Sequence, residues 1–189
     1  MTESLAFQIA PVPPFRLDLT CWALRRSPVN IIDAWDGTSY SRLFSLSGQV
    51  VEVKARQSGP PEKPVIKITA AIPDGSRQKM RRELDGLIRK MFGTDIDLSP
   101  FYKTALRNKQ LGEMTVKFSG LKPPRFASLF EALVNGVCFQ QLSIAAGTSL
   151  LNRLVAFGLV SAGRRAFPGP EDLAKITPGE LKSIGFSMN

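Results

Sequence analysis

The stretch FASLFEALVNGVCFQQLSIAAGTSLLNRLVAF, residues 126–157, decides the fold of this chain. Its first half carries apolar side chains at steps of three and four, which predicts one buried stripe on a helix: Phe126, Leu129, Phe130, Leu133 and Val137. Its second half repeats the pattern with Leu150, Leu151, Leu154, Val155 and Phe157, and Gly158 follows as a helix stop. The stretch therefore predicts two apolar helices joined as a hairpin.

The pentapeptide FQQLS, residues 139–143, lies between the two predicted helices. Ser143 is a suitable N-cap for the second helix, which places Gln140 and Gln141 at a helix-to-helix junction. Two interpretations of the paired amides follow. Either they reach outward toward a partner, or they satisfy free backbone groups at the helix ends.

The residues before the hairpin have the patterns of an antiparallel sheet covered by a helix. Alternation and β-rich composition predict strands at 15–19, within 40–55 and at 65–71, and short helices are expected at 20–26 and 101–107. Ser76 can cap a longer helix that has apolar residues at helical spacing and ends at Gly93. These elements predict an N-terminal α+β domain over residues 1–120.

Residues 117–125 are rich in glycine, proline and basic residues, which predicts a basic connector between two domains. The second predicted domain, residues 121–189, is helical. After the hairpin, short helices are expected at 170–174 and 178–183. Thr177 and Glu180 have the spacing of a capping box at the start of the last of these.

Basic residues outnumber acidic ones in this chain, with 25 Lys and Arg against 16 Asp and Glu and a pI near 9.9. Such a charge is consistent with a polyanionic partner such as nucleic acid. Six basic residues gather in the segment 77–90, interleaved with Glu83 and Asp85. That segment is either a phosphate-facing stripe or a solvated helix face with internal ion pairs.

Some function classes are excluded by what the sequence lacks. No histidine occurs, which removes histidine-based acid–base catalysis and most zinc-hydrolase schemes. Cys21 and Cys138 lie far apart in apolar surroundings, which is typical of reduced core thiols. No signal peptide is recognisable and no apolar run has the length of a membrane span, so we expect a cytoplasmic protein without membrane contact.

The spelling FEALVNGVCFQQLSIAA at residues 130–146 resembles the helix-hairpin-helix superfamily of DNA glycosylases, and within it the bacterial 3-methyladenine DNA glycosylase II branch. The resemblance continues through FPGPEDL at 167–173 and LKSIG at 181–185, and more weakly at Pro13–Phe15. It spans most of the chain, and its most specific part is the Gln-Gln-Leu-Ser junction.

The resemblance implies an α+β fold in which the N-terminal domain is similar to half of the TATA-binding protein, followed by a helical domain. The implied activity is excision of alkylated purines by a monofunctional DNA glycosylase in base-excision repair. The implied partner is double-stranded DNA with damaged bases in the bacterial cytosol or nucleoid. No cofactor and no metal are implied.

The resemblance also assigns roles to particular residues. A base to be excised must leave the stack, and a side chain then fills the gap. Gln141 matches the position of that wedge, with Gln140 and Leu142 beside it and Ser143 closing the DNA-contacting junction. Trp22 matches an aromatic residue that lines the base pocket, although a core tryptophan is the alternative for this residue.

The catalytic part of the family pattern is not found in these 189 residues. The Leu-Pro-Gly-Ile-Gly-like hairpin and the aspartate beyond it have no match, since 181–185 lacks the first glycine. The acids of the second half, Glu131, Glu171, Asp172 and Glu180, occupy no catalytic motif position, so no catalytic residue is assigned.

We therefore expect an N-terminal part of such a glycosylase, inactive as this chain alone. A non-catalytic DNA-binding module and a non-functional fragment are the alternatives. If the helical domain lacks its later helices, its apolar stripes should be exposed.

Overall fold

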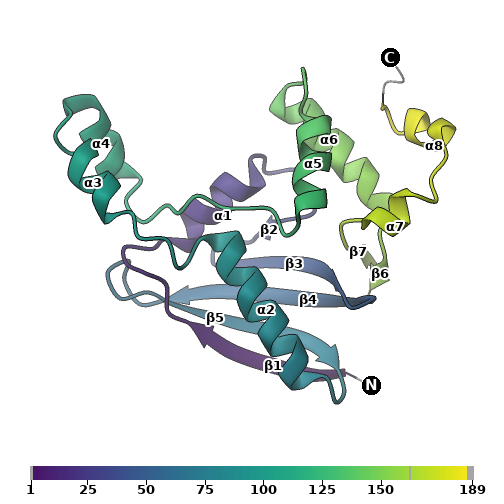
Figure 1. Ribbon diagram of the computed structural model, residues 1–189, viewed down its shortest axis with the longest axis horizontal. Helices are drawn as coiled ribbons and strands as arrows, with labels where there is room; N and C mark the ends of the chain where they lie inside the picture. The colour runs from purple at the N-terminus through teal and green to yellow at the C-terminus, as the bar shows by residue number, and fades with distance from the viewer. Residues whose placement is uncertain (1, 162, 187–189) are drawn as a thin grey trace.

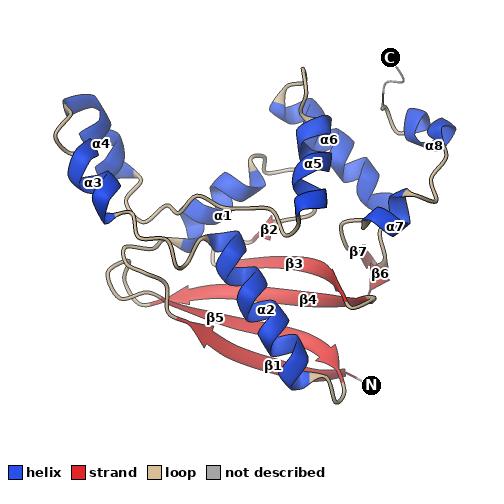
Figure 2. Cartoon of the chain, in the orientation of Figure 1, coloured by secondary structure: helices blue, strands red, loops and turns tan. Residues whose placement is uncertain are grey.

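The computed structural model describes residues 2–161 and 163–186. It has an α+β fold in which one antiparallel sheet is covered by a long helix, while shorter helices rise from one edge of the sheet (Figures 1 and 2). The expected fold class is confirmed.

The sheet contains five strands in the order β1-β5-β4-β3-β2. Their bounds are Thr2–Ile9 for β1, Ala34–Trp35 for β2, Ser39–Leu46 for β3, Gln49–Ser58 for β4 and Val65–Pro73 for β5. All neighbours pair antiparallel, with Leu5 opposite Ala70 and Val53 opposite both Arg42 and Ala70. The strands expected within 40–55 and at 65–71 are confirmed.

The start of the chain differs from the expectation. The segment 15–19, expected as a strand, enters α1, Leu17–Arg25, because Leu17, Thr20, Cys21 and Leu24 follow a helical period and are all buried. The strand at this end is β1 instead, where Leu5, Phe7 and Ile9 alternate into the core beside β5. The first strand thus lies at residues 2–9, where none was predicted, and not at 15–19.

Helix α2, Arg77–Phe92, lies across one face of the sheet (Figure 2). Its buried residues Met80, Leu84, Ile88, Met91 and Phe92 belong to the main apolar core. Gly93 ends the helix in a left-handed conformation, φ 61°, as expected. Ser76 was expected to cap the helix, but its hydroxyl donates to the carbonyl of Pro73 instead.

Two helices, α3 (Ser99–Ala105) and α4 (Lys109–Lys117), form a small hairpin at the left of Figure 1. The first is the short helix expected near 101–107, and the second was not expected. The following connector is not a free basic loop, because Lys122 is fully buried and its Nζ donates to the Ile96 carbonyl at 2.7 Å. The connector is thus packed against the loop between α2 and α3.

The hairpin predicted over residues 126–157 consists of α5, Leu129–Cys138, and α6, Ile144–Leu154, followed by a 3-10 turn, η1, at Val155–Phe157. A two-stranded ribbon, β6 (Val160–Ser161) and β7 (Arg164–Arg165), leads to α7, Pro170–Leu173, and α8, Pro178–Ser183. Thr177 and Glu180 form the expected capping box. The positions of the helices match the expected pattern, whereas the ribbon was not expected.

The two apolar stripes of the hairpin have different environments. The α6 stripe is buried with Cys138, Ile32 and Phe167, and α7 and α8 pack against the same cluster. The α5 stripe is exposed instead, since Leu129, Leu133 and Val137 are 74%, 61% and 60% accessible. The burial predicted from its helical spacing is wrong, and the exposed stripe given as the conditional expectation is found on α5 but not on α6. The buried residues of α5 are Glu131, Asn135 and Cys138. The first two bond to Arg42 and Arg26, and Cys138 belongs to the second apolar core, which is the cluster that contains the α6 stripe.

Those contacts begin at Arg42 of β3, whose side chain is completely buried. Its guanidinium donates to Asp33 at 3.0 Å and to Glu131 at 2.6 Å. Tyr40 also donates its hydroxyl to Asp33, at 2.6 Å. Glu131 therefore has a structural role, which anchors α5 to the sheet.

Candidate functional site

The candidate site is the corner between α5 and α6, residues 139–143, hereafter the junction. It points away from the sheet at the top of Figure 1. The Ser143 hydroxyl accepts a hydrogen bond from the amide of Ala146 at 3.2 Å, which confirms the predicted N-cap. The cap fixes where α6 begins and where the junction ends.

The predicted junction residues Gln140, Gln141 and Leu142 are all exposed. Neither glutamine side chain hydrogen-bonds to the protein within residues 2–161 and 163–186. The helix-end interpretation of the two amides therefore finds no support in this geometry. Both remain available to a partner.

The backbone at Gln141 adopts the left-handed conformation, φ 58°. Side chains other than glycine, asparagine and aspartate rarely adopt it, and the strain is of the order of 1–3 kcal/mol. Such outliers gather at functional sites, where the surrounding structure must hold them. Arg26 and Ser47 share this conformation, with φ 58° and 50°, but within the junction the strained residue is the one that matches the wedge.

Trp22 lies on the exposed side of α1 with 64% of its surface accessible, so the alternative of a core tryptophan is wrong. Its ring stacks on Phe118 with centroids 6.1 Å apart and planes 16° from parallel. It also lines a surface hollow of about 220 Å³ together with Asp18, Arg26 and Trp35. The hollow is therefore lined by two indole rings, one carboxylate and two arginines, Arg25 and Arg26.

The junction and the Trp22 hollow are linked by Arg26, which lines the hollow and also contacts α5. Neither Arg26 nor its partner Asn135 was predicted as a site residue from the sequence. One signal was present, because Glu131 and Asn135 are polar residues four apart on an otherwise apolar helix. That spacing indicates a polar contact face.

Most acidic side chains of the helical part are engaged in structural contacts. Glu131 is ion-paired inside the protein, and Asp172 and Glu180 accept hydrogen bonds from backbone amides at the starts of α7 and α8. The hydrogen bonds of Thr177 lower the pKa of Glu180. Glu171 is exposed on α7, which Figure 1 places beside β6 and β7, away from the junction.

The basic segment on α2 has a mixed character. Arg77 pairs with Glu3, Lys79 with Glu83, and Arg89 with both Asp85 and Asp95. Arg81, Arg82 and Lys90 are exposed and have no ion pair within the described residues. Three of the six basic residues, Arg77, Lys79 and Arg89, thus fit the interpretation of a solvated face with internal ion pairs.

The two cysteines are buried free thiols, as the sequence analysis expected. Burial raises the pKa of Cys138 to about 11 and the pKa of Cys21 further still. Both thiols are therefore protonated and unreactive at neutral pH.

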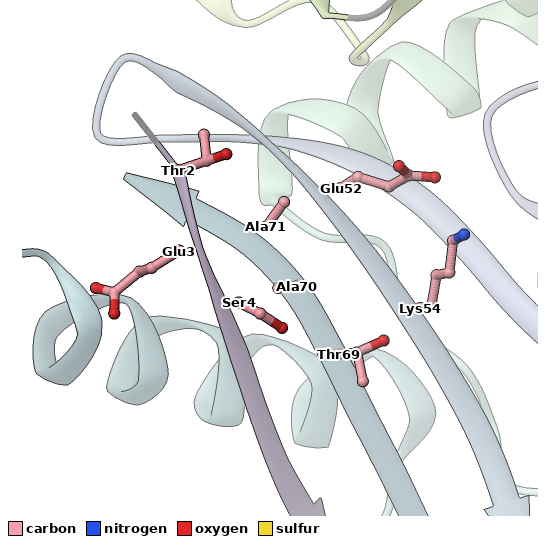
Figure 3. A pocket seen from close by; sticks show the side chains of 8 residues that line it. All are labelled: Thr2, Glu3, Ser4, Glu52, Lys54, Thr69, Ala70 and Ala71. Carbon is pink, nitrogen blue, oxygen red and sulfur yellow. The ribbon is translucent and has the colours of Figure 1, made fainter. Parts of the chain in front are cut away.

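The uncovered face of the sheet carries another hollow, of about 360 Å³ (Figure 3). Its outward side chains are small or polar, including Ser4, Thr69, Ala71 and Lys54. Its carboxylate Glu52 forms a 2.8 Å ion pair with Arg164 of β7. None of the predicted site residues lies there.

Over residues 2–161 and 163–186, no three His, Cys, Asp or Glu side chains gather as metal ligands. In the same residues no helix is long and apolar enough to cross a membrane.

Comparisons with known proteins relate this fold and site to one class. No protein-family model matches the sequence. A DNA-3-methyladenine glycosylase of Bacillus subtilis is 38% identical over 116 residues, which cover 59% of this chain and 38% of that protein. A second protein of that bacterium, YfjP, provisionally named for the same activity, is 22% identical over 96% of this chain and 61% of its own length.

Solved structures have the same fold. The 3-methyladenine DNA-glycosylase of Archaeoglobus fulgidus superposes with a TM-score of 0.76 at 20% identity, covering 96% of this chain and 62% of that one. The Clostridium acetobutylicum 8-oxoguanine glycosylase/lyase, solved with double-stranded DNA containing cytosine opposite 8-oxoG, superposes with a TM-score of 0.67 at 16% identity. That match covers all of this chain and 60% of the other.

The fold is thus that of the DNA glycosylases. Together with the sequence likeness, it relates the chain to the helix-hairpin-helix DNA glycosylase superfamily, as the junction spelling predicted. The chain spans between 38% and 61% of the length of the curated relatives it matches.

Proposed function

We propose that this chain is the DNA-engaging part of a base-excision repair glycosylase for alkylated purines, and that the junction inserts into duplex DNA. In this proposal Gln141 fills the space that an extruded base leaves, and Gln140, Leu142 and Ser143 line the contact. The observation that carries the proposal is an exposed, unbonded glutamine with φ 58° at the tip of a helical hairpin.

The chemistry of the side chain suits this task. A glutamine amide has two donors and an acceptor, so it can hydrogen-bond the base left without its partner. An extended side chain on a protruding corner can enter the stack while the helices stay outside it. The names of the two Bacillus relatives support alkylated purines as the substrate class.

We propose further that residues 1–120 and 121–189 are the two domains, the first bearing the sheet and the second the junction. The buried Arg42–Glu131 pair would then join the domains rigidly. This arrangement would hold the junction at a constant angle to the sheet, which a wedge needs when it enters DNA.

The proposed function is tested with two duplexes of the same sequence, one of which carries an abasic-site analogue. The wild-type chain should prefer the duplex with the gap, and Gln141→Ala should lose that preference. Binding to the intact duplex should change little, because phosphate contacts carry most of its affinity. If the wild type and Gln141→Ala prefer the duplex with the gap equally, the wedge role of Gln141 is refuted.

As a second candidate we propose that this chain by itself binds DNA without releasing a base. The observation that favours it is the engagement of Glu131, Asp172 and Glu180 in structural contacts. Incubation with DNA carrying 3-methyladenine or 7-methylguanine should release no free base above the protein-free control. Release above that level would assign the whole reaction to this chain.

A further inference from the structure

The junction is supported from below by one aromatic ring. Phe139 is the C-cap residue of α5, two positions before Gln141, and it packs against the second apolar core. Its amide donates to the carbonyl of Asn135 at 3.0 Å. The position of this ring therefore sets where the chain leaves α5 and enters the left-handed corner.

One face of the Phe139 ring lies under the guanidinium of Arg26, 4.1 Å from the ring centroid. The same guanidinium lies 5.4 Å from the centroid of Phe126, so it contacts aromatic rings before and after α5. A cation over an aromatic face is stabilised most where water is excluded, and Arg26 is partly buried. The contact thus joins α1 to both ends of α5.

Arg26 is itself held in place by a hydrogen-bonded chain. Its Nη2 donates to the Oδ1 of Asn135. The other end of that amide donates to the Glu131 carbonyl at 2.9 Å, which orients the oxygen toward Arg26. Since Glu131 is ion-paired to the buried Arg42, the support extends from the sheet to the junction.

Phe139 also lies close against α6, at Gly147. A Cβ added at Gly147 would lie 2.5 Å from Cδ1 of Phe139, closer than such atoms approach. The glycine is buried inside a helix, where it costs about 1 kcal/mol relative to alanine. Because Gly147 has no side chain, the ring of Phe139 can occupy this space.

We propose that Arg26 is a positioning residue for the junction: it holds Phe139 against Gly147 and thereby maintains the strained backbone that presents Gln141. The inference about DNA insertion rests on the proposed function, whereas the holding of the corner does not. Arg26→Lys keeps the charge but lacks the planar guanidinium that stacks on Phe139 and bonds to Asn135. Gly147→Ala displaces the same ring from the opposite element.

The first experiment measures the corner without DNA. Amide hydrogen exchange at Phe139 and Gln140, which donate to Asn135 and Val137, should accelerate about tenfold in Arg26→Lys and in Gly147→Ala. Arg107→Lys, at an exposed arginine on the far hairpin, is the matched control and should exchange at the wild-type rate. Unchanged exchange in both junction variants would overturn the inference.

The second experiment measures insertion with a duplex that carries 2-aminopurine at a mismatch, where extrusion costs least. Wild-type protein at saturation should raise its fluorescence, and Gln141→Ala should not. Arg26→Lys should reduce the rise about tenfold. Arg26→Gln, which removes the charge, should reduce the rise as strongly and leave the dependence of affinity on salt as in the wild type. A weaker salt dependence in Arg26→Gln would make Arg26 a phosphate contact and overturn the inference.

The two failures are distinguishable. If the wild type gives no rise, or Gln141→Ala gives the same rise, the proposed function fails, and the exchange rates still decide the role of Arg26. If Gln141→Ala abolishes the rise while Arg26→Lys and Gly147→Ala leave both fluorescence and exchange unchanged, the wedge stands and the positioning role falls. Urea midpoints within the range of the control show that each variant is folded.

Discussion

Arg42 on β3 and Glu131 on α5, 89 positions apart in the sequence, form a 2.6 Å ion pair in which both side chains are almost completely buried. Asp33 accepts a second hydrogen bond from the same guanidinium at 3.0 Å. The two carboxylates exceed the charge of Arg42 by one, and the nearby guanidinium of Arg26 interacts favourably with both. The ion pair therefore fixes α5, the helix that leads into the junction, relative to the sheet.

Removal of one partner from this pair should destabilise the protein strongly. Glu131→Ala leaves Arg42 buried with a single carboxylate, for which losses of about 3–5 kcal/mol are typical. The free energy of unfolding from urea titration measures the loss. Glu113→Ala, at an exposed acid on α4, is the control and should change stability by less than about 0.5 kcal/mol. A similar small loss for Glu131→Ala would show that the pair is structurally dispensable.

We predict that the free energy of unfolding falls at alkaline pH because the Cys138 thiol is buried. Its ordinary pKa is 9.0, and burial raises it to about 11 in the folded protein. Between these values the unfolded chain has lost a proton that the folded chain still binds, so the stability from this group declines as pH rises. Below pH 9.0 that contribution is fully present.

The measurement compares urea midpoints at pH 8 and near pH 10.5 in the wild type and in Cys138→Ala, over the window that the two pKa values define. Other groups titrate there as well, so the informative quantity is the difference between the two proteins. The variant should lose less stability on going to the higher pH. An identical loss would mean that Cys138 does not contribute to the pH dependence.

The opposite environments of the two apolar stripes give a third prediction. Leu133→Lys on α5 should change the free energy of unfolding by less than about 0.5 kcal/mol, because that side chain is exposed. Leu151→Ala on α6 should cost about 2–5 kcal/mol, because Leu151 belongs to the second apolar core. If Leu133→Lys costs as much as Leu151→Ala, the α5 stripe is covered in solution.

Elements specified by local residues were predictable from the sequence. Helix α2 has helical apolar spacing and a glycine stop. The junction ends in a serine cap, whose hydroxyl accepts a hydrogen bond from the amide three residues later. These signals lie within a few positions of each other and need no distant partner. The capping box of Thr177 and Glu180 is predictable for the same reason.

Elements that depend on distant partners were not predictable in this way. The apolar stripe of α5 indicated its buried side wrongly, because the true buried side is determined by Arg42 of β3 and Arg26 at the end of α1. Ser76 has the spacing of a cap, but the carbonyl of Pro73 competes for its hydroxyl. Arg26 gave no signal, because its role arises from a ring 113 positions later in the printed sequence.

Trp22 gives the last prediction, since its exposed indole lines the hollow that also contains Asp18 and Trp35. Purine nucleosides alkylated at N3 or N7 carry positive charge, which aromatic faces and a carboxylate both stabilise, whereas Arg25 and Arg26 of the same hollow oppose it. If this hollow receives such a base, 7-methylguanosine should quench the fluorescence of Trp22 saturably in the Trp35→Phe background. Guanosine, which is uncharged, should quench far less because it lacks the cation–π attraction. Asp18→Asn should weaken the preference for the cationic nucleoside and leave quenching by neutral acrylamide unchanged. Equal, non-saturating quenching by both nucleosides would instead mean that Trp22 only stacks on Phe118 as part of the surface.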